Sequence, residues 1–170
     1  MDTGKQKFEH DRQSGEAFEL RFMGWANRAQ RGCWYEQSVG NFKDWDLHCP
    51  HCGRTVECKS DRLEQQTKNY CFELPLLQAS KADILAYETF SDLNTPSGFA
   101  TIFVMRKLRE WCRSYYADHR NALVSGGDRG ANKMLLVPRW KLQDVDFKAH
   151  VHLTRTRRAA MDELLQKVQQ

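Results

Sequence analysis

The segment 43–61 contains two sets of side chains that could bind a metal ion, and the two sets suit different metals. Cys49 and Cys52 have the Cys-x-x-Cys spacing of half a zinc site. Around them lie oxygen and nitrogen groups of the kind that hold Mg²⁺ and activate water, namely Asp46, Glu57 and Lys59. The pattern therefore poses a choice between sulfur ligands and oxygen ligands.

Two segments of alternating character, 42–48 and 54–60, predict a β-hairpin with its turn at Pro50–Gly53. In the register that this turn sets, Asp46 lies opposite Glu57, with Cβ atoms about 4.5–5.5 Å apart. Because side chains alternate along a strand, one face of the hairpin is polar and carries Asp44, Asp46, Glu57 and Lys59. The other face is apolar and carries Trp45, Leu47 and Val56.

Two carboxylates at this separation repel each other. At an effective dielectric constant near 20, the cost is roughly 3 kcal/mol for charges ~5 Å apart. A hard divalent cation reverses the sign of this effect, and Lys59 could then orient a water molecule or offset negative charge on a phosphate. The alternative is an ion pair on an exposed sheet face, which is worth only ~0–1 kcal/mol.

A helix is predicted from about Gly15 to Gly32, because an apolar stripe recurs every three or four residues at Phe18, Phe22, Trp25 and Ala29. Ser14 would cap its first turn. Glu16 lies in that turn, where a negative charge suits the helix dipole. The preceding residues, 1–13, are polar and are expected to form a flexible arm.

The rest of the chain predicts further strands and helices around the hairpin. Strands are expected at 33–39, 70–76, 134–138 and 82–90, the last of which could instead begin as a helix. Segment 101–119 is expected to begin as a strand and continue as a helix, 154–170 to be a closing helix, and 92–98 and 125–133 to be loops. The sequence thus predicts a single α/β (α+β) domain over residues 14–170, with a mixed, mostly antiparallel central sheet flanked by helices.

The order of the polar groups resembles the PD-(D/E)XK nuclease superfamily, whose core is a helix, a hairpin carrying Asp and then Glu-x-Lys, and further strands and helices. Asp46 and the run Glu57-Cys58-Lys59 match this pattern, while Trp45 stands where the motif has proline. The resemblance implies a restriction-endonuclease-like core and hydrolysis of phosphodiester bonds with Mg²⁺ or Mn²⁺.

The resemblance also implies a role for each matching residue. Asp46 and Glu57 would hold the metal together with the backbone carbonyl of Cys58, and Lys59 would position the water. Glu16 resembles the helix-borne glutamate that many members add to the site.

Segment 67–88 is similar to a stretch of small phage-type and restriction-type members, in which Thr-x-Asn precedes a strand ending in Glu and then Ser-x-Ala-Asp. On this basis accessory or substrate-contacting roles are expected for Asn69, Glu73, Ser80, Lys81 and Asp83. Lys133 is added to them as a basic contact. Structural roles are equally consistent with the pattern, since Asp83 could cap a helix, Asn69 serve a turn and Glu73 face solvent.

A closed zinc site needs four ligands, and Cys49 and Cys52 are the one pair with suitable spacing. The pair could be completed by other cysteines in the fold, Cys33, Cys71 or Cys112, or by a second subunit. His48 and His51 lie near, but four ligands from one tight turn would be strained. Alternatively the thiols simply pack at the hairpin tip. The sequence on its own favours oxygen ligands over sulfur.

Composition is consistent with a nucleic-acid partner. The chain of 170 residues has a formal net charge of +4 and a sequence pI near 8.8. Its basic residues are expected to contact phosphates and gather at Arg106, Lys107, Arg109, Arg113, Arg129, Lys133, Arg155, Arg157 and Arg158. The sequence has no apolar run long enough to span a bilayer and no apolar signal core, so a cytoplasmic protein without a membrane partner is expected.

The sequence therefore predicts a structure-directed or end-directed nuclease of repair, recombination or phage replication, with DNA favoured over RNA by the resemblance. A homodimer would suit the cutting of two strands. One alternative is a non-catalytic nucleic-acid-binding or adaptor module, zinc-stabilised through Cys49 and Cys52. Another is an inhibitor or interaction protein that has kept a nuclease scaffold.

Overall fold

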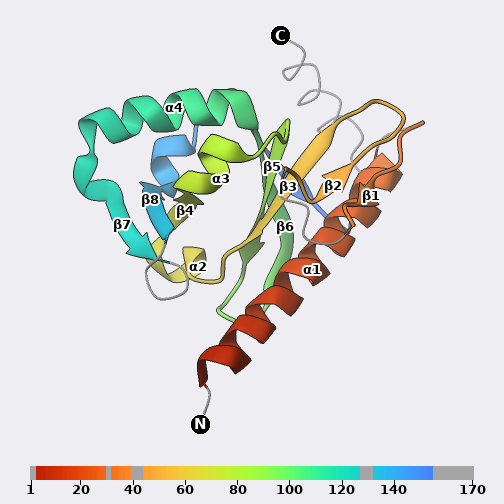
Figure 1. Ribbon diagram of the computed structural model, residues 1–170, viewed down its shortest axis with the longest axis horizontal. Helices are drawn as coiled ribbons and strands as arrows, with labels where there is room; N and C mark the ends of the chain where they lie inside the picture. The colour runs from red at the N-terminus through yellow and green to blue at the C-terminus, as the bar shows by residue number, and fades with distance from the viewer. Residues whose placement is uncertain (1–2, 30–31, 40–43, 127–131, 155–170) are drawn as a thin grey trace.

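The computed structural model describes residues 3–29, 32–39, 44–126 and 132–154. Six of its described strands form a central sheet in the order β1-β2-β3-β5-β6-β9, and Figure 1 labels the first five of them. These strands are β1 (Glu36–Gln37), β2 (Leu47–His48), β3 (Thr55–Ser60), β5 (Ile84–Phe90), β6 (Pro96–Val104) and β9 (Lys148–His152). Within this sheet only β3 and β5 pair in parallel. The predicted class, a mixed and mostly antiparallel sheet flanked by helices, is confirmed.

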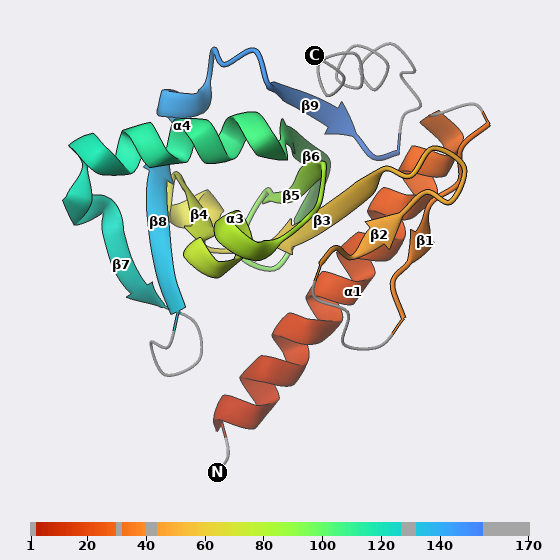
Figure 2. The same ribbon diagram turned by 45° about the horizontal axis from the view of Figure 1, so that its top comes forward.

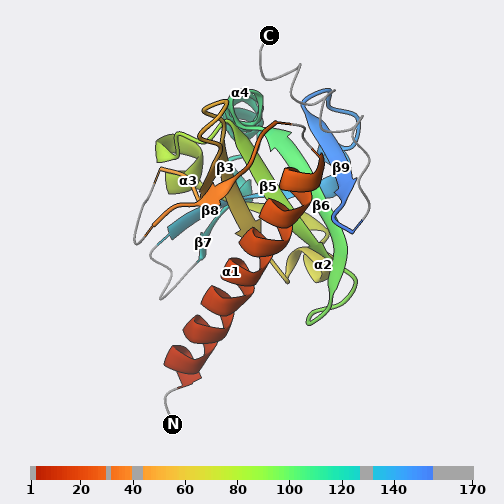
Figure 3. The ribbon, with the colours of Figure 1, turned by 90° about the vertical axis from the view of Figure 1, so that its right-hand side faces the viewer.

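One face of the central sheet is covered by α1 (Thr3–Ala29), which crosses it diagonally (Figure 3). The predicted apolar stripe faces the core, with all of Phe18, Phe22, Trp25 and Ala29 buried. The helix begins at Thr3 rather than near Ser14, so segment 3–13, expected to be a flexible arm, is helical instead. Gly32 follows the helix with φ of 75°, a conformation that glycine adopts without strain.

The opposite face of the central sheet is covered by a second layer (Figure 2). This layer contains α3 (Leu74–Ala79), α4 (Met105–Asp118) and a three-stranded sheet of β4 (Asn69–Glu73), β8 (Asn132–Pro138) and β7 (Leu123–Gly126). Tyr70 and Phe72 of β4 contact Phe103 of β6 with ring centroids 5.3 and 5.9 Å apart, which locks the two sheets together. The short helices α2 (Glu64–Thr67), Arg120–Ala122 and Arg139–Leu142 complete the described elements.

Several predicted boundaries were wrong. The strands expected at 33–39 and 42–48 shrink to β1 and β2, and the strand expected at 70–76 ends at Glu73, where α3 begins with Pro75 in its first turn. The strand β9 of the central sheet and the strand β7 of the second sheet were not predicted, and neither was the separation into two sheets. β6 begins inside the loop expected at 92–98. The closing helix expected at 154–170 and the residues 127–131 lie outside the described residues, apart from Thr154.

The predicted hairpin register is confirmed. Leu47 pairs with Val56 and His48 pairs with Thr55, as the turn at Pro50–Gly53 requires. Gly53 adopts φ of 73° in that turn. Leu47 and Val56 are fully buried against the core, as predicted for the apolar face of the hairpin.

Among the described helices, none is both long enough and apolar enough to cross a membrane.

The face of the sheet under α1 also contains a buried charge. Glu88 of β5 is only 1% exposed and forms an ion pair with Arg21 of α1, while Ser60 donates a hydrogen bond of 2.7 Å to its other oxygen. This contact joins α1 to the two parallel strands β3 and β5.

We expect Arg21→Ala to lower the free energy of unfolding by about 2 kcal/mol, because it leaves the Glu88 carboxylate buried without its cation. The matched control is Lys107→Ala, which breaks an ion pair of 3.5 Å with exposed Asp146 and should cost less than about 1 kcal/mol. Urea denaturation of both variants measures the difference. Equal losses in the two variants would show that the buried pair has no special role in stability.

Candidate functional site

The carboxylate of Asp46 is built into the backbone ladder beside β3. The Asp46 N–H donates to the carbonyl of Val56 at 2.9 Å, and Oδ2 of its side chain accepts the N–H of Cys58 at 2.7 Å. The side chain thus takes the place of a backbone carbonyl at the end of the paired region. Burial raises the pKa of Asp46, and the Cys58 hydrogen bond partly opposes this effect.

Glu57 lies on β3 close enough to Asp46 for their charges to repel. Burial and then the charge of Asp46 raise the pKa of Glu57 to about 8, although Ser80 and Lys59 act in the opposite direction. The two carboxylates are therefore neighbours, although Asp46 precedes β2 and is not part of its ladder with β3, and the pair is energetically costly while both groups are charged.

Ser80 joins Glu57 to the segment before Asp46. Its Oγ lies 3.1 Å from Glu57 Oε2 and 3.1 Å from the backbone oxygen of Asp44. The Ser80 hydroxyl has a single proton, and the Asp44 carbonyl can only accept it. Both contacts can therefore be hydrogen bonds at the same time only when Glu57 carries a proton that it donates to Ser80 Oγ. Lys81, the next residue, pairs with the Asp44 carboxylate at 2.8 Å on the surface. Of the predicted accessory residues, Ser80 thus touches the site and Lys81 supports the segment leading to it.

Lys59 follows Glu57 on the same face of β3 and forms an ion pair with Glu73 at the end of β4. Asn132 of β8 donates to the other oxygen of Glu73 at 3.3 Å. Lys59 and Glu73 also line a cleft of about 460 Å³ between the end of β3, the loop after it and β8. Lys59 therefore lies where a substrate in the cleft could reach it, while Asp46 and Glu57 do not line the cleft itself.

The helix carboxylate next to Asp46 is Glu19, not the predicted Glu16. Burial and the charge of Asp46 raise the pKa of Glu19, and Gln37 donates to its Oε2 at 3.0 Å. Glu16 forms an exposed ion pair of 2.6 Å with Arg12. At 100° per residue, Glu16 points roughly 150° away from the centre of the apolar stripe and Glu19 roughly 90° away. The positions of the two residues on the helical wheel, which the sequence alone gives, therefore already favoured Glu19 over Glu16 as the carboxylate nearer the sheet.

Arg109 brings a positive charge to the same site from α4. Its guanidinium donates to the carbonyl of Ser80, and Nε is buried with no hydrogen-bond partner among the described residues. Burial lowers the pKa of Arg109, Arg113 lowers it further, and the charge of Glu57 opposes the shift. The sequence indicated Arg109 only as one member of a basic cluster, since its distance from Glu57 depends on how α4 packs.

The remaining predicted residues lie apart from the carboxylates. Asp83 accepts hydrogen bonds from the N–H and hydroxyl of Thr55, at 3.0 and 3.2 Å, and so ties the start of β3 to the chain entering β5. Asn69 begins β4, at the opposite end of that strand from Glu73. Lys133 donates to Ser125 at 2.9 Å on the exposed side of β8.

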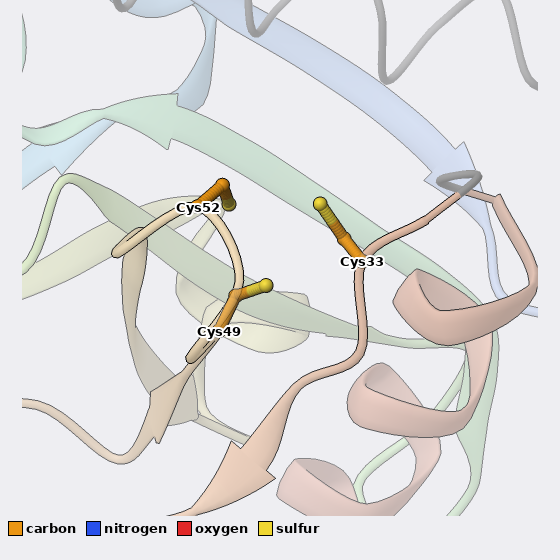
Figure 4. A group of neighbouring side chains, drawn as sticks. All are labelled: Cys33, Cys49 and Cys52. Atoms are coloured by element: carbon orange, nitrogen blue, oxygen red, sulfur yellow. The ribbon is translucent and has the colours of Figure 1, made fainter.

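A second candidate metal site lies at the tip of the same hairpin. The sulfurs of Cys33, Cys49 and Cys52 all lie within 4.8 Å of one another (Figure 4). Among the described residues, this is the one group of three or more metal-ligating side chains at such distances. Cys33 thus joins the predicted pair, whereas Cys71 and Cys112 do not, and all six cysteines are free thiols.

Asp46 and Glu57 thus offer a metal ion two carboxylates, whereas the cysteine group at the hairpin tip offers three clustered side chains. The donor set of Asp46 and Glu57 nevertheless fits a hard cation, because both carboxylates are partly buried, both have raised pKa values and they lie beside each other on one hairpin. Comparison of the chain with protein-family models, with curated proteins and with solved structures finds no match. The geometry of the site is therefore the basis on which its function must be argued.

The raised pKa of Glu57 predicts how the metal-free protein responds to pH. Between about 4.5 and 8 the folded protein holds a proton on Glu57 that the unfolded chain has lost, so stability falls as pH rises through this window. Glu57→Gln removes this loss and should be more stable than the wild type at pH 9 by of order 4 kcal/mol, with a smaller difference at pH 5.

Denaturation of both proteins in the presence of a chelator at the two pH values measures this effect, since titrating groups that do not interact with Glu57 cancel in the comparison. Adding Mg²⁺ should restore stability to the wild type and leave Glu57→Gln unchanged. A pH dependence that is the same in both proteins would contradict the burial of a titrating Glu57.

Proposed function

We propose that this protein is a metal-dependent nuclease that hydrolyses phosphodiester bonds of DNA, with Mg²⁺ or Mn²⁺ as cofactor. The observation that carries the proposal is the pair of adjacent, partly buried carboxylates, Asp46 and Glu57, with the amine of Lys59 on the same face of β3. A structural protein has little reason to keep two buried carboxylates whose charges repel.

Each residue of the site has a distinct task in this proposal. Asp46 and Glu57 bind the cation, and the carbonyl of Cys58, which the PD-(D/E)XK resemblance adds as a ligand, lies between Glu57 and Lys59 in the chain. The cation supplies charge stabilisation on the phosphate and makes water a better nucleophile. Lys59 orients the water or contacts a phosphate oxygen when a substrate in the cleft competes with Glu73 for its amine.

Arg109 supports the proposal from the α4 side. Its guanidinium lies near enough to Glu57 for their charges to interact, and a guanidinium in this position can attract a phosphate group. We infer that Arg109 offsets negative charge as the phosphodiester bond is cleaved. The PD-(D/E)XK resemblance favours DNA over RNA as the substrate. Cleavage at branched structures or strand ends, rather than at a base sequence, is proposed because the sequence contains no identifiable recognition helix.

Cleavage assays test the proposal directly. Labelled single-stranded, double-stranded and branched DNA, with RNA in parallel, are incubated with Mg²⁺, with Mn²⁺ and with a chelator. We expect cleavage that requires the metal and that falls at least about 100-fold in Asp46→Asn, Glu57→Gln and Lys59→Ala.

The matched control for these variants is Asp44→Asn. Asp44 is two residues from Asp46, but its carboxylate pairs with exposed Lys81, so this variant should retain activity within a few-fold of the wild type. Cleavage that survives chelation, or that persists in Asp46→Asn, would refute the mechanism. Tight DNA binding with no cleavage under any condition would instead favour the non-catalytic adaptor.

The position of Glu19 gives a second test. Because Glu19 interacts with Asp46 and Glu16 pairs with Arg12 on the surface, Glu19→Gln should lower the cleavage rate more than Glu16→Gln. We expect roughly a 10-fold or larger loss for Glu19→Gln, as is typical when a group that orients a metal ligand is removed. Single-turnover rates at saturating Mg²⁺ compare the two variants. A larger effect from Glu16→Gln would show instead that Glu16, the residue that the PD-(D/E)XK resemblance suggested, is the helix glutamate that supports the site.

A further inference from the structure

Three thiols from two separate parts of the chain converge above the candidate active site. Cys33 lies in the loop between α1 and β1, whereas Cys49 precedes the turn between β2 and β3 and Cys52 lies within it. Figure 4 shows the three side chains pointing toward a common centre. Cys49 is buried and Cys52 is exposed, so the centre lies at the surface of the core.

We propose that Cys33, Cys49 and Cys52 bind a structural zinc ion, with His51 as the fourth ligand. In a tetrahedral site with Zn–S bonds of about 2.3 Å, ligand atoms lie about 3.8 Å apart. The three sulfurs already lie within 4.8 Å of one another, so each pair needs to move by no more than about 1 Å. Soft thiolate ligands in this geometry select zinc over the hard cations that carboxylates bind.

The fourth ligand comes from the same turn. Nδ1 of His51 lies 3.7 Å from the sulfur of Cys33, which is close to the edge of such a tetrahedron. His51 is not within 4.8 Å of all three sulfurs, so its side chain must move toward Cys49 and Cys52 when the metal binds. Its ring packs 6.0 Å from that of Trp34, the residue after Cys33. Cys33 comes from a loop that is distant in the sequence. The turn therefore provides only Cys49, His51 and Cys52, which avoids the strain of four ligands from one tight turn.

The surroundings of the thiols are fixed before any metal binds. Asn27, near the end of α1, accepts the N–H of Tyr35 at 2.5 Å and donates to its carbonyl at 3.2 Å, which holds the loop carrying Cys33. In the turn, the N–H of Gly53 donates to the carbonyl of Cys49 at 2.8 Å, and the N–H of Cys49 donates to Arg54 at 2.8 Å. Local hydrogen bonds therefore orient the chain on each side of the site.

The zinc would connect the elements that carry the acidic groups. Cys33 lies in the loop that follows α1, the helix that carries Glu19. Cys49 and Cys52 belong to the hairpin that carries Asp46 and Glu57. Because β1 and β2 have only two residues each, few backbone hydrogen bonds hold this edge of the sheet. A metal crosslink there stabilises the hairpin against α1, a structural role separate from the chemistry of the carboxylates.

Elemental analysis of the full chain, purified under reducing conditions without a metal-binding tag, tests the proposal. We expect one zinc per chain. Replacing zinc with Co²⁺ should produce the thiolate charge-transfer bands and intense visible bands of a tetrahedral cobalt site. This measurement uses the wild-type protein, so it does not depend on whether variants fold.

Variants then identify the ligands. Cys33→Ser, Cys49→Ser and Cys52→Ser should each lose the stoichiometric zinc and the cobalt spectrum, while the control Cys71→Ser keeps both. His51→Ala should weaken zinc binding and change the visible cobalt bands, and an unchanged spectrum would remove His51 as a ligand. A wild-type protein with no zinc and no thiolate–cobalt bands, or a disulfide between two of the three cysteines in reduced protein, would overturn the proposal.

Discussion

The hydrogen bond from the N–H of Cys58 to the carboxylate of Asp46 is the contact on which the candidate site depends. A backbone carbonyl would normally accept at such a position, and using a side chain instead holds a carboxylate rigidly at the end of a strand pair. Glu57 is the preceding residue on β3, so the same contact fixes the distance between the two acids. Their repulsion and burial then raise the pKa of Glu57 to about 8. The site is thus strained electrostatically, which suits a cation and is unfavourable without one.

The structure stabilises this costly pair from several elements. Ser80, at the end of α3, contacts Glu57, and Arg109 of α4 contacts Ser80 in turn. Asp83 joins the start of β3 to the chain entering β5. On the other side of the sheet, α1 brings Glu19 toward Asp46. Residues far apart in the sequence therefore meet around the hairpin, and Ser80 and Asp83, which were expected to have accessory or substrate-contacting roles, form hydrogen bonds with Glu57 and Thr55 of β3.

The candidate oxygen ligands and the candidate sulfur ligands lie at separate places on the same hairpin. The carboxylates lie where β2 and β3 pair beside the second layer, whereas the thiols lie at the tip and reach toward the loop after α1. The choice posed by the segment 43–61 assumed that one set would carry the chemistry and the other would be incidental. In our proposals the carboxylates, which are hard donors, take part in the reaction, and the thiols, which are soft donors, stabilise the fold.

The sequence by itself determined the local features: the buried stripe of α1, the helix after β6, and the hairpin register in which Leu47 pairs with Val56. These follow from hydrophobic period and turn geometry, which act over a few residues. Only the tertiary structure decided that Glu19 rather than Glu16 approaches Asp46, that Cys33 rather than Cys71 or Cys112 joins the cysteine pair, and that β4, β8 and β7 form a second sheet. Each of these depends on packing between segments far apart in the chain, and no short-range pattern specifies which distant surfaces meet.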